Sequence, residues 1–521
     1  MAKLKSPTDA LPLLAFKIAP RQFDVSYRFS NISLRDQIVR AQMLVRTLVQ
    51  MGLVKPGAAE DDSEFQLLIC GAGAAGLAAA REAQAHNVSF FLIEKGRVAP
   101  GGVLASKAPR YVSPAMYEWP HPNHSVHSYP LDRPRLLDDE TASKPALKLK
   151  LGKPVLIRTF GSRFGAGMAN DLASWKQNFD DYVNDLPMQR RFLLATQTTL
   201  DDQTKIKLRA TLDHKVSIHG VSLRRFRLPK VELASEDGVL AGHKFIFSYV
   251  IYAVGFAGES KFYADGMEPS EDFQHTPFWG PDQIHRDRIG FKRPPSVGIL
   301  GSGDGAMQDA LRCLVQQSTP HPLAIWNAML ANQPRLKRSA NLKEALSGIA
   351  AADGYTTGGA VWTHQLGIFK SLDKTFGHII HELVAQERVA LLDALRPIIR
   401  TDVKRVTIVT QQGYFTKAYA LNRFLVLLFK TLLPEFDECF PRLEILSGNV
   451  TAFDETKLGP RGARLTIQRA GQTTRNCDLV IIRGGLDRMN PPTQLVGLSG
   501  MDTGRAELGR IRPPIRPAGK S

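Results

Sequence analysis

Two strand–glycine–helix units in a chain of 521 residues predict an α/β protein with two Rossmann-type folds. The first unit starts at residue 67 and the second at residue 297. Helical patterns before the first unit and after the second predict an N-terminal helical extension and a helical insertion. A chain of this length exceeds one ordinary hydrophobic core, so two nucleotide folds with additions account for it.

The first unit combines the features of a dinucleotide-binding βαβ motif. An apolar strand, Leu67–Cys70, leads into glycines spaced G-x-G-x-x-G, and an alanine-rich helix follows. The N-terminus of such a helix presents unpaired N–H groups to a pyrophosphate. Glu94 ends the next strand, where an acid that binds a ribose is expected. The turn residues predicted to contact the dinucleotide are Gly71, Gly73, Ala74, Ala75 and Gly76.

An alternative interpretation of the same turn is purely structural. Glycine and alanine also serve tight strand-to-helix turns in α/β proteins that bind no nucleotide. The strand, the glycines, the helix and Glu94 fall in register, and this agreement favours the nucleotide site over the structural turn.

The residues after Glu94 resemble a known family. Lys95 and then Gly101-Gly102 follow, as in the FAD-binding half of flavoproteins that carry two dinucleotide-binding domains, such as disulfide reductases and flavin monooxygenases. A strand ending in Ala253-Val254-Gly255 resembles the A-T-G strand end of this group, with valine in place of threonine. The resemblance implies FAD as the cofactor. It adds Lys95, Gly102, Ala253 and Gly255 to the expected FAD contacts.

The second unit continues this order. Gly301, Gly303 and Ala306 are spaced G-x-G-x-x-A, and they become expected cofactor contacts. A later strand that begins near Cys477 and ends in Gly484-Gly485 resembles the strand returning to the FAD domain in disulfide-reductase-like enzymes.

The order of these motifs defines the expected domains. They are an N-terminal helical extension over residues 1–60, an FAD-binding domain over 61–290, a second NAD(P)-binding-like domain over 291–484 with a helical insertion at about 331–440, and a return segment with a basic tail over 485–521. The extension is expected as one helix after Ser33, with Ile38, Ala41, Val45 and Leu48 on its apolar face.

The second unit departs from the family in two ways. Asp304 stands inside its glycine turn, where a carboxylate would repel a pyrophosphate. The run Pro322–Trp326, interpreted as the next strand, ends without an acid. Arg335, Lys337 and Arg338 are candidates for a 2′-phosphate contact, which makes NADPH a possible second cofactor, and a basic helix end is the alternative.

Composition limits the classes of function. The chain has 43% hydrophobic residues and no apolar run long enough to span a bilayer, so a soluble protein is expected. Its four cysteines include no close pair, which argues against dithiol chemistry and favours a reducing cytoplasm. The net charge of +17 favours anionic partners, yet no nucleic-acid-binding signature accompanies it.

Candidate catalytic residues follow Gly102 in a segment rich in aromatic residues, histidine and proline. The resemblance places this segment near the flavin, with Tyr117 or His121 as proton donor or acceptor and Arg110 as the anchor of an anionic substrate. A proline-stiffened loop that packs on the core is the alternative. His121, His124 and His127 lack an acid or cysteine at ligand spacing, so no metal site is expected.

Together these features predict an FAD-dependent oxidoreductase, NAD(P)H-linked, that acts on a small molecule as a reductase or monooxygenase. One alternative is an FAD-dependent oxidase whose second nucleotide site does not function. Another is a flavin-binding sensor that recruits a protein partner through the helical insertion.

Overall fold

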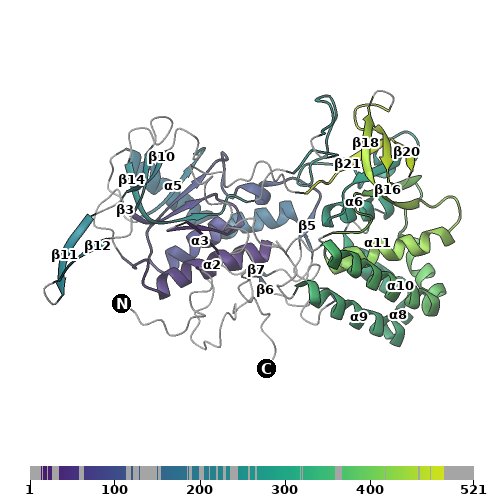
Figure 1. Ribbon diagram of the computed structural model, residues 1–521, viewed down its shortest axis with the longest axis horizontal. Helices are drawn as coiled ribbons and strands as arrows, with labels where there is room; N and C mark the ends of the chain where they lie inside the picture. Colours follow the sequence, from purple (N-terminus) through teal and green to yellow (C-terminus); the bar gives the residue numbers. More distant parts are fainter. Residues whose placement is uncertain are drawn as a thin grey trace.

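The computed structural model describes residues 13, 16–19, 21–25, 34–57, 64–112, 119–120, 128–129, 149–150, 154–184, 186, 191–198, 205–209, 212–218, 221–226, 230–234, 244–255, 259–264, 267–316, 318, 321–357, 366–416, 418–455, 458–469 and 471–485. Figure 1 shows two lobes side by side, with the N-terminal half of the sequence in one lobe and the C-terminal half in the other. Each lobe is built around its own parallel sheet.

The first lobe contains an eight-stranded sheet. Four neighbouring strands run parallel in the order β14-β3-β4-β9, and β2 extends the sheet beyond β14. Their bounds are β3 Glu64–Cys70, β4 Phe90–Glu94, β9 Phe192–Thr196, β14 Lys244–Tyr252, β1 Lys17–Ala19 and β2 Gln22–Asp24, with β10 Lys205–Arg209 and β13 Lys230–Ala234 antiparallel beside them. The central strands β3 and β4 are almost wholly buried, as strands covered on both faces must be.

Helices α2 (Leu34–Gln50), α3 (Ala74–Ala85) and α5 (Ile157–Val183) accompany this sheet, and α2 packs along α3. The expected N-terminal helix is confirmed: Ile38, Ala41, Val45 and Leu48 are all fully buried. Arg40 and Arg46 of the same helix are buried as well. Arg46 forms an ion pair with Glu82 of α3, which compensates its burial.

The second lobe repeats the arrangement with a four-stranded parallel sheet in the order β17-β16-β15-β21. Its strands are β15 Ser296–Leu300, β16 Arg405–Thr410, β17 Arg442–Ser447 and β21 Leu479–Ile482. An antiparallel sheet of β18 Asn449–Asp454, β19 Ala463–Gln468 and β20 Gln472–Cys477 precedes β21, just as β10 and β13 precede β14 in the first lobe. The two lobes therefore share one topology, as the paired glycine motifs predict.

In the described part of the chain, six helices accompany the second sheet, and among them α6 and α11 contact its strands. They are α6 Asp304–Leu314, α7 Pro322–Asn332, α8 Pro334–Arg338, α9 Ala340–Thr357, α10 Leu366–Leu395 and α11 Ala420–Leu432. The expected strand at Pro322–Trp326 is wrong, because these residues begin α7. His321 caps this helix by accepting from the Ala324 amide at 3.1 Å, and Pro322 suits its first turn.

The strand that follows β15 in the sheet is instead β16, which begins more than a hundred residues further along the chain. The segment expected as a helical insertion at about 331–440 is therefore divided by a central strand. The large buried cluster of this lobe joins the sheet to all five helices from α7 to α11. The domain boundaries themselves stay a prediction.

The remaining short elements lie around the two sheets. They are β5 Tyr111–Val112, β6 Ser128–Tyr129, β7 Leu149–Lys150, β8 Val155–Leu156, β11 Leu212–Ile218, β12 Val221–Phe226, η2 Gly102–Ala105, η5 Asp287–Gly290, η6 Arg396–Ile398 and η7 Leu433–Glu435. Among the described helices, none is both long and apolar enough to cross a membrane.

Candidate functional site

The first glycine turn connects β3 to α3 beside the end of β14. Gly71 has φ +99°, and a Cβ there would lie 2.6 Å from the Ala253 carbonyl oxygen. A Cβ on Gly76 would overlap the carbonyl oxygen of Gly71. The first and third glycines therefore serve the tight turn and the close approach of helix to strand, which are the roles this motif assigns to them.

Gly73 has a different environment. Its neighbour nearest to the position of a Cβ is the Gly101 carbonyl oxygen, 3.9 Å away, so the space in front of it is open. Gly73 is also the N-cap of α3, and no side chain caps this helix. An open space against the uncapped N-terminus of a helix is suited to a phosphate group, because the amides and the helix dipole both favour an anion.

Glu94 lies against the same turn. Its Oε2 accepts from the Ala72 amide at 2.6 Å, and its Oε1 accepts from the Gly96 amide at 2.7 Å. The residue is 8% exposed. Each carboxylate oxygen can accept more than one hydrogen bond, so the carboxylate is oriented by the backbone and keeps acceptor capacity for ribose hydroxyls.

The other residues expected at the FAD site divide into two groups. Ala253 is buried against the turn, and its amide donates to the Cys70 carbonyl at 2.8 Å. Gly255, with φ +79°, follows it. Lys95 and Gly102 are exposed, and open space surrounds the Cβ position of Gly102.

Gly101 is a residue whose role the sequence did not reveal. A Cβ there would lie 2.7 Å from the Glu94 carboxyl carbon, so only glycine lets that carboxylate reach Ala72. The G-G dipeptide is visible in the sequence, but the dependence on Glu94 appears only when the turn is assembled.

The second glycine turn follows the same plan. Gly301 has φ +150°, and a Cβ there would overlap the Arg483 carbonyl at the end of β21. A Cβ on Gly71 would overlap the Ala253 carbonyl in the same way. Gly303 is the N-cap of α6, again with no side-chain cap, and Ala306 is fully buried where the helix meets the sheet. The three residues expected here occupy the positions that the motif predicts.

Asp304, the unusual carboxylate of this turn, reaches toward α11. Its Oδ1 accepts from the Tyr419 amide at 3.0 Å and from Asn422 Nδ2 at 2.6 Å. Its Oδ2 accepts from Gln308 Nε2 at 2.7 Å. The carboxylate thus contacts the first turn of α11, where a negative charge is favourable.

The carboxyl end of β16 is where an acid would hold the ribose of a nucleotide bound to this lobe. The strand ends in Thr410 and is followed by Gln411 and Gln412, so no acid is present there. Arg469 instead approaches from the turn between β19 and β20, with its Nη2 3.6 Å from a Cβ built on Gly413. Arg335, Lys337 and Arg338 are exposed on α8, which packs on α7, α9 and α10.

Arg110 lies at the junction of the lobes and is 3% exposed. Its Nη1 pairs with Asp309 Oδ1 at 2.6 Å, and its Nε donates to the Phe278 carbonyl at 3.0 Å. The guanidinium expected to anchor a substrate therefore already has protein partners. Tyr117 and His121, together with His124 and His127, lie outside the described residues.

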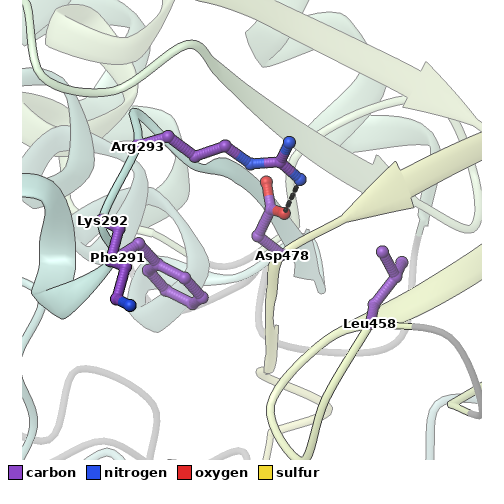
Figure 2. Close-up of a pocket in the computed structure, with 5 residues that line it drawn as sticks. All are labelled: Phe291, Lys292, Arg293, Leu458 and Asp478. Atoms are coloured by element: carbon purple, nitrogen blue, oxygen red, sulfur yellow. Dashed lines mark hydrogen bonds and ion pairs between the residues drawn. The ribbon is translucent and has the colours of Figure 1, made fainter.

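A shallow pocket of about 430 Å³ is found elsewhere on the second lobe, lined by Phe291, Lys292, Arg293, Leu458 and Asp478 (Figure 2). Asp478 accepts from the Ser296 amide at 2.8 Å, at the start of β15. The pocket therefore lies at the amino ends of the parallel strands, whereas nucleotides bind at their carboxyl ends. In the described part of the chain, no group of three His, Cys, Asp or Glu side chains is arranged to hold a metal ion.

Comparison with known protein families supports a Rossmann-like fold around the first glycine turn. Residues 69–134 match the family model of the NAD(P)-binding Rossmann-like domain. No curated protein sequence matches the chain.

Solved structures that match this chain include the bacillithiol disulfide reductase of Staphylococcus aureus, with 11% identity over 81% of this chain and 77% of that chain and a TM-score of 0.34. The thioredoxin reductase of T. acidophilum shares 13% identity over 82% and 78% of the two chains, with a TM-score of 0.33. A steroid monooxygenase bound to NADP shares 12% identity over 81% and 71%, with a TM-score of 0.34. Similarity at this level does not establish a shared activity.

The family match covers the first glycine turn together with Glu94. The second lobe repeats the same strand order around a second glycine turn. The chain thus contains two Rossmann-type units, and residues 69–134 in the first of them match the NAD(P)-binding Rossmann-like domain.

Proposed function

We propose that this protein is an FAD-dependent oxidoreductase that holds the pyrophosphate of FAD at the N-terminus of α3. The observation that carries the proposal is the open space at Gly73 against an uncapped helix, with Glu94 fixed beside it. An NAD(P)-binding Rossmann-like match over the same residues supports a dinucleotide there.

The chain's own residues have distinct parts in this proposal. The α3 amides and helix dipole stabilise the pyrophosphate charge, and Glu94 accepts hydrogen bonds from ribose hydroxyls. FAD supplies the redox chemistry when it is bound. Tyr117 or His121 is proposed as the proton donor or acceptor for a small-molecule substrate in the cytoplasm.

The second glycine turn is proposed as the site of the nicotinamide nucleotide. Gly303 is the N-cap of α6 and provides no side-chain cap, just as Gly73 provides none for α3. Arg469, in place of an acid, stands beyond the carboxyl end of β16, which favours the 2′-phosphate of NADPH over the free ribose of NADH.

A second candidate is an FAD-dependent oxidase whose second lobe is structural. One observation favours it: the segment after β16 lies across the second turn. The Thr416 amide donates to the Ser302 carbonyl at 2.8 Å, and Asp304 is tied to Tyr419 and Asn422. In that case an organic substrate, and not NADPH, would be the electron donor. The helical cover of this lobe would then be free to serve a protein partner.

Titration of the purified protein, first with FAD and then anaerobically with NADPH, tests the proposal. We expect stoichiometric FAD binding, seen as a shifted visible flavin spectrum, and bleaching at near-stoichiometric NADPH. A flavin that binds but stays oxidised would favour the oxidase.

The variant Gly73→Asp, which adds a carboxylate in the open space, should abolish FAD binding. Gly377→Asp is its matched control, because Gly377 has open space around its Cβ position but lies on α10. A protein that takes up no FAD, or a Gly73→Asp variant that binds FAD normally, would refute the proposed site.

A further inference from the structure

A cluster of six charged side chains lies where the two lobes meet; five of them are buried, and Glu259 is 19% exposed. Three are arginines and three are acids, so their formal charges balance. Arg110 comes from the segment between η2 and β5 of the first lobe, and Glu259 and Asp282 come from the connection between the lobes. Asp309 and Arg312 lie on α6, and Arg483 directly follows β21.

Asp309 is at the centre of this cluster and is fully buried. Its Oδ1 lies 2.6 Å from Arg110 Nη1 and 3.1 Å from Arg312 Nη1, and its Oδ2 lies 2.7 Å from Arg483 Nε. Burial alone would raise the pKa of Asp309, but the three arginines lower it well below its ordinary value. The carboxylate is therefore ionised over the whole physiological pH range.

The partners of Asp309 belong to different parts of the molecule. Arg312 is on the same helix, and Arg483 is in the same lobe, whereas Arg110 comes from the first lobe. Arg312 also pairs with Asp282 of the connection at 2.7 Å, and Arg483 pairs with Glu259 at 3.1 Å. All six charges are paired only when the lobes and their connection take this one relative position.

Burial of these charges disfavours any other relative position of the two lobes. A charge removed from water is costly unless a partner compensates it, so a movement that separated Arg110 from Asp309 would leave a buried guanidinium without its ion pair. Phe278 adds to this restriction, because its ring lies 3.8 Å from the Arg110 guanidinium and its carbonyl accepts from Arg110 Nε.

A second contact between the lobes follows a few residues later. The ring centroids of Tyr111 and His321 are 4.5 Å apart. Trp119 is 3% exposed and lies within the hydrophobic core of the second lobe. Its ring centroid is 5.4 Å from that of Trp326 and 5.3 Å from that of Phe424. The chain leaving the first lobe thus anchors an aromatic side chain in the second.

We propose that Asp309 is a positioning residue that fixes the first glycine turn relative to the second through its ion pair with Arg110. The two lobes then form one rigid body, and neither turn moves relative to the other when a ligand binds. The consequence for electron transfer rests on the proposed function, but the rigidity itself does not.

Distance measurement between two spin labels tests this inference. Cys439 is an exposed native cysteine of the second lobe, and Cys70, Cys313 and Cys477 are buried. Lys176→Cys adds an exposed site on α5 of the first lobe. With labels at 176 and 439, we expect one narrow distance distribution in the full chain, unchanged by FAD. The variants Asp309→Asn and Arg110→Gln should each broaden it.

Glu82→Gln is the matched control, because the Arg46–Glu82 pair is also buried but lies within the first lobe. This variant should destabilise the protein and leave the distance distribution narrow. Circular dichroism identifies a variant that fails to fold. If Asp309→Asn fails to fold, the test rests on Arg110→Gln, in which Asp309 keeps its ion pairs with Arg312 and Arg483.

A narrow distribution in folded Arg110→Gln, or a broad one in the wild-type chain, would overturn the inference. FAD binding is measured separately on the same samples. If the wild-type chain shows a narrow distribution but takes up no FAD, the proposed function fails and the positioning role remains.

Discussion

The three glycines of the first turn differ in what surrounds them. A Cβ at Gly76 would overlap the Gly71 carbonyl, whereas Gly73 has open space and a φ of −79° that any residue adopts. We expect Gly76→Ala to lower the free energy of unfolding by about 3 kcal/mol or more through forced backbone movement. Gly73→Ala should change it by less than about 1 kcal/mol yet weaken FAD binding about tenfold, because its methyl group occupies the space of the pyrophosphate.

Urea unfolding of the FAD-free protein and FAD titration measure the two effects separately. If Gly73→Ala bound FAD as tightly as the wild type, the pyrophosphate would have to lie elsewhere. Equal stability of Gly76→Ala and the wild type would contradict the close packing of α3 on β3.

His321 makes the stability of the second lobe sensitive to acid. Burial lowers the pKa of its imidazole from about 6.5 to about 4, and its neutral Nδ1 accepts from the Ala324 amide at the start of α7. A histidine with a lowered pKa takes up its proton in the unfolded state first. Its contribution is therefore complete above pH 6.5 and is lost as the pH falls toward 4.

His321→Asn keeps a capping side chain and removes the titrating group. Between pH 7 and pH 4.5, the wild type should lose about 2 kcal/mol more unfolding free energy than this variant, as measured by urea unfolding at each pH. His378→Asn, on the exposed face of α10, is the control and should follow the wild type. Parallel pH profiles of wild type and His321→Asn would show that this cap is not the source of acid sensitivity.

At the scale of elements, the turn between β19 and β20 brings a basic residue to the carboxyl end of β16. Arg469 lies near Gly413 there, and the residues that directly follow the strand, Gln411 and Gln412, are not acidic. Loss of a charge-assisted hydrogen bond costs about 1.5–3 kcal/mol. We expect Arg469→Gln to weaken binding of NADPH at least tenfold and to leave binding of NADH unchanged.

Equilibrium binding of both nucleotides to the FAD-free protein is the measurement. Arg464→Gln, another exposed arginine of the same antiparallel sheet, is the control and should bind both nucleotides as the wild type does. An equal loss of NADH and NADPH binding in Arg469→Gln would mean that this residue does not read the 2′-phosphate.

Elements with a local physical cause were predictable from the sequence. The turn at Gly71 and the helix Leu34–Gln50 are specified by neighbouring residues, through backbone conformation in one case and a 3.6-residue apolar period in the other. Pro322–Trp326 was not predictable, because five apolar residues carry no decisive period and the deciding cap, His321, acts through its ring nitrogen. The position of β16 after a long helical segment likewise has no local signal.

At the scale of the whole molecule, the contacts that join the lobes have no sequence signature at all. Arg110 and Asp309 are 199 residues apart. The sequence predicted Arg110 as the anchor of an anionic substrate, whereas its protein partner is determined by how two separately folded sheets meet. Long-range pairing of this kind follows from the assembled molecule and not from any pattern along the chain.

The same junction predicts how the molecule unfolds. Because the buried charges and Trp119 couple the two cores, the wild-type chain should unfold in one calorimetric transition. Trp119→Ala removes the aromatic anchor between Trp326 and Phe424, at a cost of about 3–5 kcal/mol, and should separate the transition into two. Trp175→Ala is the control: this tryptophan is fully buried within the first lobe, against Phe90. Its loss should lower the midpoint while the lobes still unfold together, whereas two transitions in the wild type would show that the junction does not couple the folds.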